Sequence, residues 1–320
     1  MQEIIIDSGR SGQRLDKFLR KYLPEAGNGF LYKMLRKKNI TLNNKRAEGN
    51  ELLQPGDVVK LFLSEETLAK FAPARDESGY LRAYERLSGI SVIREEADIL
   101  ILNKPVGILT QKAEDTDLSL NEWLVGYLLQ SGKVTAESLR AFRPSVCNRL
   151  DRNTSGLVLC AKTLAGAQYL SRCIRMREVG KFYRTVCVGE IRNEIRMEGF
   201  LRKDRAANKV SVSSKADEPD AQEIRTICRP LSASGAYTLL EVELITGKTH
   251  QIRAHLANIG HPVAGDFKYG DRAVNERLRS QYGLTGQLLH AYRIVLPEEG
   301  ELIAPYPEMF ERIVRGLGLI

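Results

Sequence analysis

Residues 148–156 read NRLDRNTSG, a polar turn between two apolar runs, and the rest of the chain can be organised around it. Asp followed by Asn-Thr-Ser-Gly is ordinary turn chemistry, so an Asx turn or a helix cap would explain Asp151. Its neighbours Arg149 and Arg152 favour an ionised carboxylate. Such a carboxylate also suits nucleophilic or base chemistry at a sugar carbon, which makes Asp151 a candidate catalytic residue.

A second segment, GKTHQIRAH at residues 247–255, predicts the start of a helix. Thr249 is the expected N-cap, and Gly260 stops the apolar stripe that follows. The spacing places Arg253 beside the core, where a partly buried guanidinium needs an anion. A structural salt bridge and a role in a site both satisfy that need.

A metal site and a Ser-His-Asp triad are two alternative interpretations of these residues. His250 and His255 are five apart without an adjacent Glu, so the zincin spacing is absent and no metal is expected. A triad of Ser155, His250 and Asp266 would lack the Gly-x-Ser-x-Gly elbow. The sequence has neither a phosphate-binding Gly-x-x-x-x-Gly-Lys-Ser/Thr motif nor a dinucleotide fingerprint, so no nucleotide cofactor is expected.

The third segment, KFYRTVCVG at residues 181–189, alternates as a strand does. This places Tyr183 on the face opposite Phe182 and Val186. A tyrosine in a strand commonly packs half-buried, and its flat ring can equally stack on a nucleobase. Both interpretations stay open on the pattern alone.

From residue 93 onward the predicted elements alternate without an internal repeat. Strands are expected at 99–102, 157–161, 182–188 and 237–245, and helices at 118–129 and 164–174. Some strands are consecutive and others are separated by helices. This order predicts an α+β fold with a mixed or antiparallel sheet rather than a doubly wound one.

The N-terminal 63 residues carry 12 Lys and Arg against 7 Asp and Glu, a net charge of +5 out of +8 for the whole chain. An amphipathic helix is expected at 15–22, followed by a second, basic helix and strands at 40–42 and 59–63. Four cations crowd the outer side and end of that second helix: Lys33, Arg36, Lys37 and Lys38. They are either a solvated helix face or a contact for a polyanion.

Composition narrows the class of protein. The chain has 320 residues, a length typical of about two domains. Its residues are 43% hydrophobic and 28% charged, a composition that permits a packed core. No apolar run is long enough to span a bilayer and no export signal is evident, so we expect a cytoplasmic protein. The five cysteines form no Cys-x-x-Cys pair and are expected to be reduced thiols. The net charge of +8 suggests a polyanionic partner.

The order of elements in the N-terminal segment resembles the RNA-binding domain named after small-subunit ribosomal protein S-four. The matching residues are RLDKFL at 14–19, the basic second helix, LNNK at 42–45 and PGDVV at 55–59. Asn44 stands where that family often has Gly, and Asn tolerates the left-handed position. The resemblance implies that the basic helix contacts RNA phosphates.

The remainder resembles the RluA family of pseudouridine synthases from about residue 93 to the C-terminus. The matching segments are RLD at 149–151, TSG at 154–156, KFY at 181–183, GKTHQIR at 247–253, GHPVAGD at 260–266, YG at 269–270 and LHA at 289–291. Asn148 departs from the pattern, since many members carry His there. We expect this change to alter local hydrogen bonding without removing activity.

The resemblance implies a pseudouridine synthase fold, with a central mixed, mainly antiparallel sheet flanked by helices. It implies an enzyme that flips uridine out of RNA, breaks its C–N glycosidic bond and rejoins the base through carbon. Asp151 is then the essential carboxylate, as nucleophile or base, and Arg253 pairs with it. Tyr183 stacks on the uracil and can act as acid or base, and Arg149 fills the vacated place.

The expected organisation is an RNA-binding module at 1–63, a linker at 64–89 and a catalytic domain at 90–320. The appended module favours large-subunit ribosomal RNA as the substrate, and we expect a monomer. Two alternatives remain at this point: a transfer RNA pseudouridine synthase, and a non-catalytic RNA-binding factor in ribosome assembly.

Overall fold

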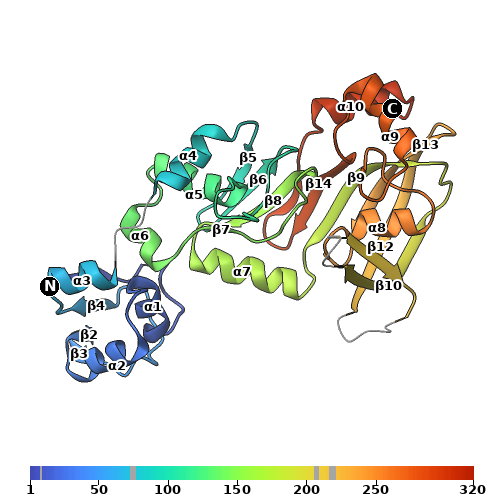
Figure 1. The fold of residues 1–320 in the computed structure, drawn as a ribbon. Coiled ribbons are helices and arrows are strands. Elements are labelled where there is room, and N and C mark those ends of the chain that lie inside the picture. The colour runs from blue at the N-terminus through green and yellow to red at the C-terminus, as the bar shows by residue number, and fades with distance from the viewer. Residues whose placement is uncertain (8, 73–76, 205–208, 216–220) are drawn as a thin grey trace.

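The computed structural model describes residues 1–7, 9–72, 77–204, 209–215 and 221–320. Figure 1 shows an elongated molecule with the N-terminal unit at one end and the C-terminal helices at the other. A large sheet lies between them. Within the described residues no helix is both long and apolar enough to cross a membrane.

The N-terminal unit has a hydrophobic core of its own. Two short helices lie on a four-stranded sheet of order β1-β4-β2-β3. Their bounds are β1 Gln2–Ile5, α1 Leu15–Tyr22, α2 Asn28–Arg36, β2 Ile40–Leu42, β3 Lys45–Arg46 and β4 Val58–Leu61. Phe18 and Leu19 of α1 are fully buried against Ile40 and Leu61 of the sheet. The apolar stripe of α1 therefore packs as its spacing predicts.

The segment 64–89, expected as a linker, carries two helices, α3 (Glu65–Phe71) and α4 (Ser78–Arg86). Residues 73–76 of that segment lie outside the described part of the chain. Helix α3 packs Leu68 and Phe71 onto the N-terminal core. Helix α4 packs instead on α5 (Leu120–Gln130), because Gly126 leaves room for it: a Cβ there would lie 2.3 Å from the Tyr80 carbonyl oxygen.

The large sheet has eleven strands among the described residues, in the order β11-β10-β12-β13-β9-β14-β8-β6-β5, with β15 beside β14 and β7 beside β8. The bounds are β5 Ser91–Glu95, β6 Ile99–Lys104, β7 Ser145–Val146, β8 Ser155–Ala161, β9 Gly180–Val188, β10 Ile195–Asp204, β11 Lys209–Ser213, β12 Gln222–Ala233, β13 Tyr237–Leu244, β14 Leu289–Leu296 and β15 Gly300–Ile303. Of the described pairings, β14 with β8 is parallel and the others are antiparallel. The predicted α+β class with a mixed, mainly antiparallel sheet is confirmed.

Residues 99–102 of β6 are all apolar because both faces of the strand are covered. Ile99 and Ile101 face α7 (Leu164–Arg175), while Leu100 and Leu102 face α5. Figure 1 shows these two helices on opposite sides of the strands. A strand covered on both faces needs apolar residues at every position, because its period-two alternation has no solvent side.

The remaining helices frame the sheet. They are α6 Ala136–Ala141, α8 Gln251–Asn258, α9 Arg272–Tyr282 and α10 Glu308–Gly316. Helix α10 packs Phe310 and Ile313 against a core that includes Val186 of β9. At the other end, α1 contacts α6, and Gln168 of α7 donates a hydrogen bond to the Gly12 carbonyl. The N-terminal unit is thus docked beside α6 and α7.

Candidate active site

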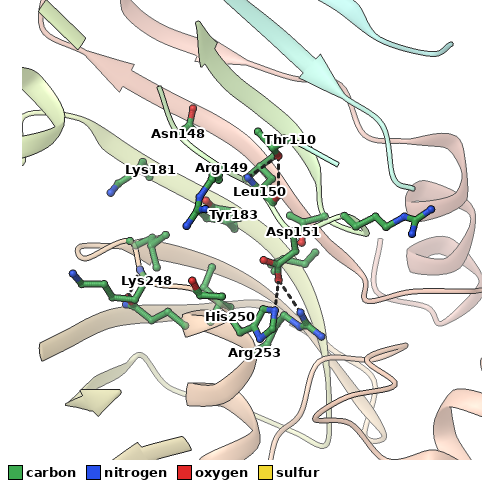
Figure 2. Close-up of a pocket in the computed structure, with 18 of the residues that line it drawn as sticks. Thr110, Asn148, Arg149, Leu150, Asp151, Lys181, Tyr183, Lys248, His250 and Arg253 are labelled. Atoms are coloured by element: carbon green, nitrogen blue, oxygen red, sulfur yellow. Dashed lines mark hydrogen bonds and ion pairs between the residues drawn. The ribbon is translucent and has the colours of Figure 1, made fainter. Parts of the chain in front are cut away.

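One cavity of about 1100 Å³ opens where β9, β13, α8 and the turn before β8 meet. Four residues singled out from the sequence line it: Arg149, Asp151, Tyr183 and Arg253. Figure 2 shows Asp151 on one side of this cavity, facing His250 and Arg253 on the other. A volume of this order accommodates a bound nucleotide.

The turn carrying Asp151 is held by hydrogen bonds from a distant loop. Thr110 Oγ1 donates to the Leu150 carbonyl at 2.7 Å and accepts the Leu150 N–H at 3.1 Å. Gly156 then lets β8 run beside β14, since a Cβ there would lie 2.2 Å from the Ala291 carbonyl oxygen. The backbone on both sides of Asp151 is therefore fixed before any substrate binds.

Lys104, at the end of β6, also holds the turn that carries Asp151. Its ammonium is fully buried and donates to the carbonyls of Pro105, Ile108 and Arg152 at 2.9–3.1 Å. Burial lowers the pKa of Lys104 to about 7, against the attraction of Asp151. Its bond to Arg152 fixes the residue next to the candidate catalytic carboxylate.

Arg253 joins two carboxylates. Its Nη1 lies 2.7 Å from Asp151 Oδ2, while Nε and Nη2 lie 2.7 and 2.8 Å from the two oxygens of Asp266. Burial opposes the charged form of Asp266, yet its bonds to Arg253 and to two backbone N–H groups hold the pKa of its carboxyl below the ordinary value. The two carboxylates in turn raise the pKa of Arg253 in spite of its burial. The guanidinium therefore stays charged and oriented.

His250 forms the other wall beside Asp151. Its Nε2 lies 3.8 Å from Asp151 Oδ2, and its Nδ1 lies 2.9 Å from Tyr269 Oη. Because Tyr269 Oη accepts the Val210 N–H at 2.8 Å, we assign its own proton to the bond with Nδ1. The imidazole proton then sits on Nε2 and is directed towards Asp151. Burial lowers the pKa of His250, against the attraction of the nearby Asp151 carboxylate.

The expected helix cap at Thr249 is wrong. Helix α8 begins one residue later, and His250 occupies the N-cap position in the left-handed region, with φ of 54° and no capping side chain. That backbone conformation is uncommon for a residue other than glycine. This left-handed conformation occurs together with the position of the imidazole between Tyr269 and Asp151. Capping preferences alone do not predict it.

Tyr183 lies in β9 with its ring against the cavity and 7% of its surface exposed. Desolvation raises the pKa of its hydroxyl, and the nearby Asp151 adds to this effect. Among the described residues the hydroxyl has no hydrogen-bond partner. The hydroxyl therefore keeps its proton at neutral pH.

Arg149 and Asn148 have different environments. Arg149 is exposed, lines the cavity and forms no ion pair with another described residue, and Figure 2 shows it on the same side as Tyr183. Asn148 Oδ1 accepts the Leu159 N–H at 2.7 Å and its Nδ2 donates to the Leu157 carbonyl. Asn148 therefore binds the β8 backbone, which leaves Arg149 and Asp151 unobstructed.

The alternative triad does not assemble. Ser155 is 2% exposed and bonds His290 Nδ1, whereas Asp266 is taken up by Arg253. His255 bonds Thr226 inside the core. Within the described residues no three His, Cys, Asp or Glu side chains are grouped to hold a metal ion.

The basic cluster of the second helix lies outside this cavity. Lys33, Arg36, Lys37 and Lys38 are all exposed on the N-terminal unit, and Lys38 follows the C-cap residue of the helix with φ of 59°. In Figure 1 this unit lies well away from α8. The structure therefore brings together four of the eight sequence-predicted site residues.

Sequence reasoning missed several groups that shape the site. The sequence motifs do not single out Thr110, Lys104 or Tyr269 as site residues, and for His250 they suggest only metal or triad chemistry. Lys104 carried a usable signal: a lysine at the end of a strand that begins with four apolar residues must bury its amine or turn outward. No local pattern indicates the partner of Thr110, which lies 40 residues away in sequence.

The chain is similar to known proteins over nearly its whole length. Residues 98–258 match the model of the RNA pseudouridylate synthase family. The chain is 31% identical to ribosomal large subunit pseudouridine synthase C of Vibrio vulnificus, over 99% of this chain and 96% of that protein. It is 29% identical to the protein of the same name from Escherichia coli, over 98% and 96%.

Solved structures share the fold. Human RNA pseudouridylate synthase domain containing 4 superposes with a TM-score of 0.59 at 22% identity, covering 76% of this chain and 98% of that one. Since the family model covers half of the sequence and relatives match nearly its whole length, the assignment does not rest on a single motif. The chain therefore belongs to the RNA pseudouridylate synthase family, in its RluA branch, and isomerises uridine in RNA to pseudouridine.

Proposed function

We propose that this enzyme modifies uridines of large-subunit ribosomal RNA, with Asp151 as its essential catalytic group. The substrate follows the printed names of relatives that match the chain end to end. The excess of positive charge in residues 1–63 supports a large polyanionic substrate. The proposal extends to a cytoplasmic monomer that needs no metal or nucleotide cofactor.

The reaction conserves every heavy atom of the nucleotide. The N1–C1′ glycosidic bond breaks, the uracil turns within the cavity, and a C5–C1′ bond forms. The proton on C5 leaves to solvent and N1 takes up a proton, so no oxidant, reductant or hydrolytic water is consumed. Because C5 loses its hydrogen, release of tritium from that position follows each turnover.

Asp151 acts on the ribose of the extruded uridine. Its side chain is 25% exposed to the cavity while that of Arg253 is only 8% exposed, so the substrate meets the carboxylate and not the cation. This is the single observation that carries the assignment. A carboxylate held in an oriented ion pair is preorganised for reaction at a sugar carbon.

The neighbouring side chains suit the remaining steps. Tyr183 stacks on the uracil, and its protonated hydroxyl is placed to act as a general acid or to exchange a proton during rejoining. Arg149 enters the stack that the flipped nucleotide leaves. Flipping costs a few kcal/mol, less from a loop than from a duplex, and an inserted cation offsets part of this cost.

The N-terminal residues 1–63 serve as an RNA-binding module of the S-four type in this proposal, followed by a connecting segment at 64–89 and a catalytic domain at 90–320. Lys33, Arg36, Lys37 and Lys38 would contact phosphates. Their separation from the cavity means that they add affinity to a large RNA without taking part in the chemistry.

The test is pseudouridine mapping in cells lacking the gene, complemented with the wild-type protein or with Asp151→Asn. The proposal predicts missing pseudouridines in large-subunit ribosomal RNA that only the wild type restores. Losses confined to transfer RNA would contradict the substrate. Full restoration by Asp151→Asn would contradict the catalytic assignment.

A further inference from the structure

We infer that Phe267 is a binding platform for a base of the RNA strand, next to the uridine that enters the cavity. The inference rests on the proposed use of this cavity for RNA. It concerns a residue in the loop between α8 and α9 that contributes no reactive group.

Its location distinguishes Phe267 from ordinary exposed apolar residues. Twelve large hydrophobic side chains are exposed among the described residues, and isolated cases of this kind need no explanation. Phe267, at 52% exposure, is the one of these twelve that lines the cavity. An apolar ring at the mouth of a site for a nucleic acid does need an explanation.

The turn that carries Phe267 is rigid. The preceding carboxylate, Asp266, accepts the N–H groups of Lys268 and Tyr269 at 2.9 and 3.1 Å. The Asp266 carbonyl accepts a bond from Asn275 Nδ2 at 2.9 Å. Asp266 itself is fully buried. These bonds fix the backbone on both sides of Phe267. The exposed position that results would also accept a polar side chain, so packing alone does not explain the aromatic ring.

A half-exposed aromatic ring on a held backbone is suited to a base. Base–aromatic stacking contributes favourably whatever the base, because every base has a π-face. An aromatic side chain has only two χ angles, so it also loses little conformational freedom on binding. Two lysines, Lys248 and Lys268, line the same cavity, so the backbone of a strand bound there would meet positive charge.

The same turn ties this platform to the reacting group. Asp266 binds Arg253, and Arg253 binds Asp151 at 2.7 Å. A base on Phe267 is therefore held in a fixed relation to the carboxylate that meets the extruded uridine. Such a contact adds affinity for the flanking strand and leaves the chemical step to other residues.

The experiment measures the Kd of the full-length protein for a short RNA that contains a target uridine. Phe267→Ala is compared with Phe267→Trp, which retains a ring. Ile303→Ala is the matched control, because Ile303 is an apolar side chain with 54% exposure that lies on β15, outside both the cavity and residues 1–63. We expect Phe267→Ala to weaken binding by roughly 5- to 100-fold, and the other two variants to bind as the wild type does.

A set of RNAs with one abasic nucleotide at each position flanking the uridine locates the contact. At one position the base removal should weaken binding to the wild type and leave Phe267→Ala unaffected. An unchanged Kd for Phe267→Ala on the intact RNA would overturn the inference, as would an equal loss on every abasic RNA.

Assays on the same RNA separate the proposed substrate from the proposed role of Phe267 in binding. If the wild-type protein binds this RNA but never forms pseudouridine in it, the proposed substrate fails while the Kd comparison still decides the role of Phe267. Melting temperatures of the variants should match that of the wild type, because a half-exposed ring contributes little to the core.

Discussion

Asp151 Oδ2 and Arg253 Nη1 lie 2.7 Å apart although 102 residues separate them in the sequence. The turn before β8 supplies the carboxylate and helix α8 supplies the cation. Asp266 completes the arrangement by accepting hydrogen bonds from the other two guanidinium nitrogens, Nε and Nη2. The arrangement therefore contains one carboxylate that faces the cavity and one that is buried, and they should respond differently to mutation.

Asp266→Asn is expected to reduce stability more than Asp151→Asn does. Asp266 is fully buried and pairs with Arg253 through both oxygens, whereas the side chain of Asp151 is 25% exposed. Breaking a buried pair costs about 3–5 kcal/mol. Urea unfolding of both variants measures the difference. A larger loss of stability in Asp151→Asn would contradict the structural assignment of the two carboxylates.

Tyr183→Phe separates stacking from proton transfer. The ring remains, so RNA affinity should not change, while turnover should fall by roughly 10²–10⁴-fold if the hydroxyl moves a proton in the rate-limiting step. Tyr183→Leu should lose affinity as well. Single-turnover assays and binding curves on one RNA provide both quantities. Wild-type turnover in Tyr183→Phe would limit this residue to stacking.

Tyr269→Phe tests the hydrogen bonds that orient His250. It removes the bonds to His250 Nδ1 and Val210, at about 1 kcal/mol each, and frees the imidazole to change tautomer. We expect roughly a fivefold drop in kcat with little change in KM. The loss should not add to that of His250→Gln, because both variants disrupt the same contact with Asp151. Additive losses would show that the two residues act independently.

Acid should destabilise the protein through two buried histidines. Burial lowers the pKa of His255 and of His290 to about 4 from 6.5. Between these values the unfolded chain binds protons that the folded chain excludes, so stability is lost as the pH falls from 6.5 towards 4, by ~3 kcal/mol for each histidine.

His255→Leu is the variant that tests this dependence. His255 Nε2 is buried and has no hydrogen-bond partner in the described part of the chain, and Thr226 keeps its bond from Gln251 when the imidazole is removed. Melting temperatures at about pH 7 and about pH 5 should differ less in this variant than in the wild type. An identical difference would exclude His255 as a source of the acid sensitivity.

Neutralising the basic cluster should affect binding and not chemistry. Lys33, Arg36, Lys37 and Lys38 are replaced by Gln. The slope of the logarithm of the binding constant against the logarithm of the salt concentration, measured with a long RNA, should then decrease in magnitude by about 0.7–0.9 for each cation that contacts a phosphate. Turnover of a short, saturating RNA should not change. Arg315→Gln, on α10, is a suitable control. A salt slope equal to that of the wild type would remove the cluster from the RNA interface.

The sequence alone predicts much of this architecture because its strongest elements have strict periods. The stripe of α1, the doubly buried β6 and the alternation of β9 each occur where periodicity places them. The start of α8 differs, because His250 adopts a left-handed conformation that accompanies its contact with Tyr269. Local capping preferences carry no information about such a contact.

In the site too, some features follow from local sequence patterns and others depend on long-range packing. The partial burial of Arg253 follows from its place beside the stripe of α8, but its pairing with Asp151 was expected only from the family resemblance. The support of Asp151 by Thr110 and Lys104 depends on long-range loop packing that no local pattern encodes. Phe267 likewise reads as an ordinary loop residue until the buried Asp266 and the cavity are seen together.

Tritium release from RNA labelled at C5 of uridine, by purified wild type and Asp151→Asn, tests the central claim most directly. Binding of the same RNA is measured in parallel to establish that the variant is folded and loaded. The account predicts that Asp151→Asn binds this RNA and releases no tritium above background. Release at a rate near that of the wild type would show that the reaction does not depend on this carboxylate.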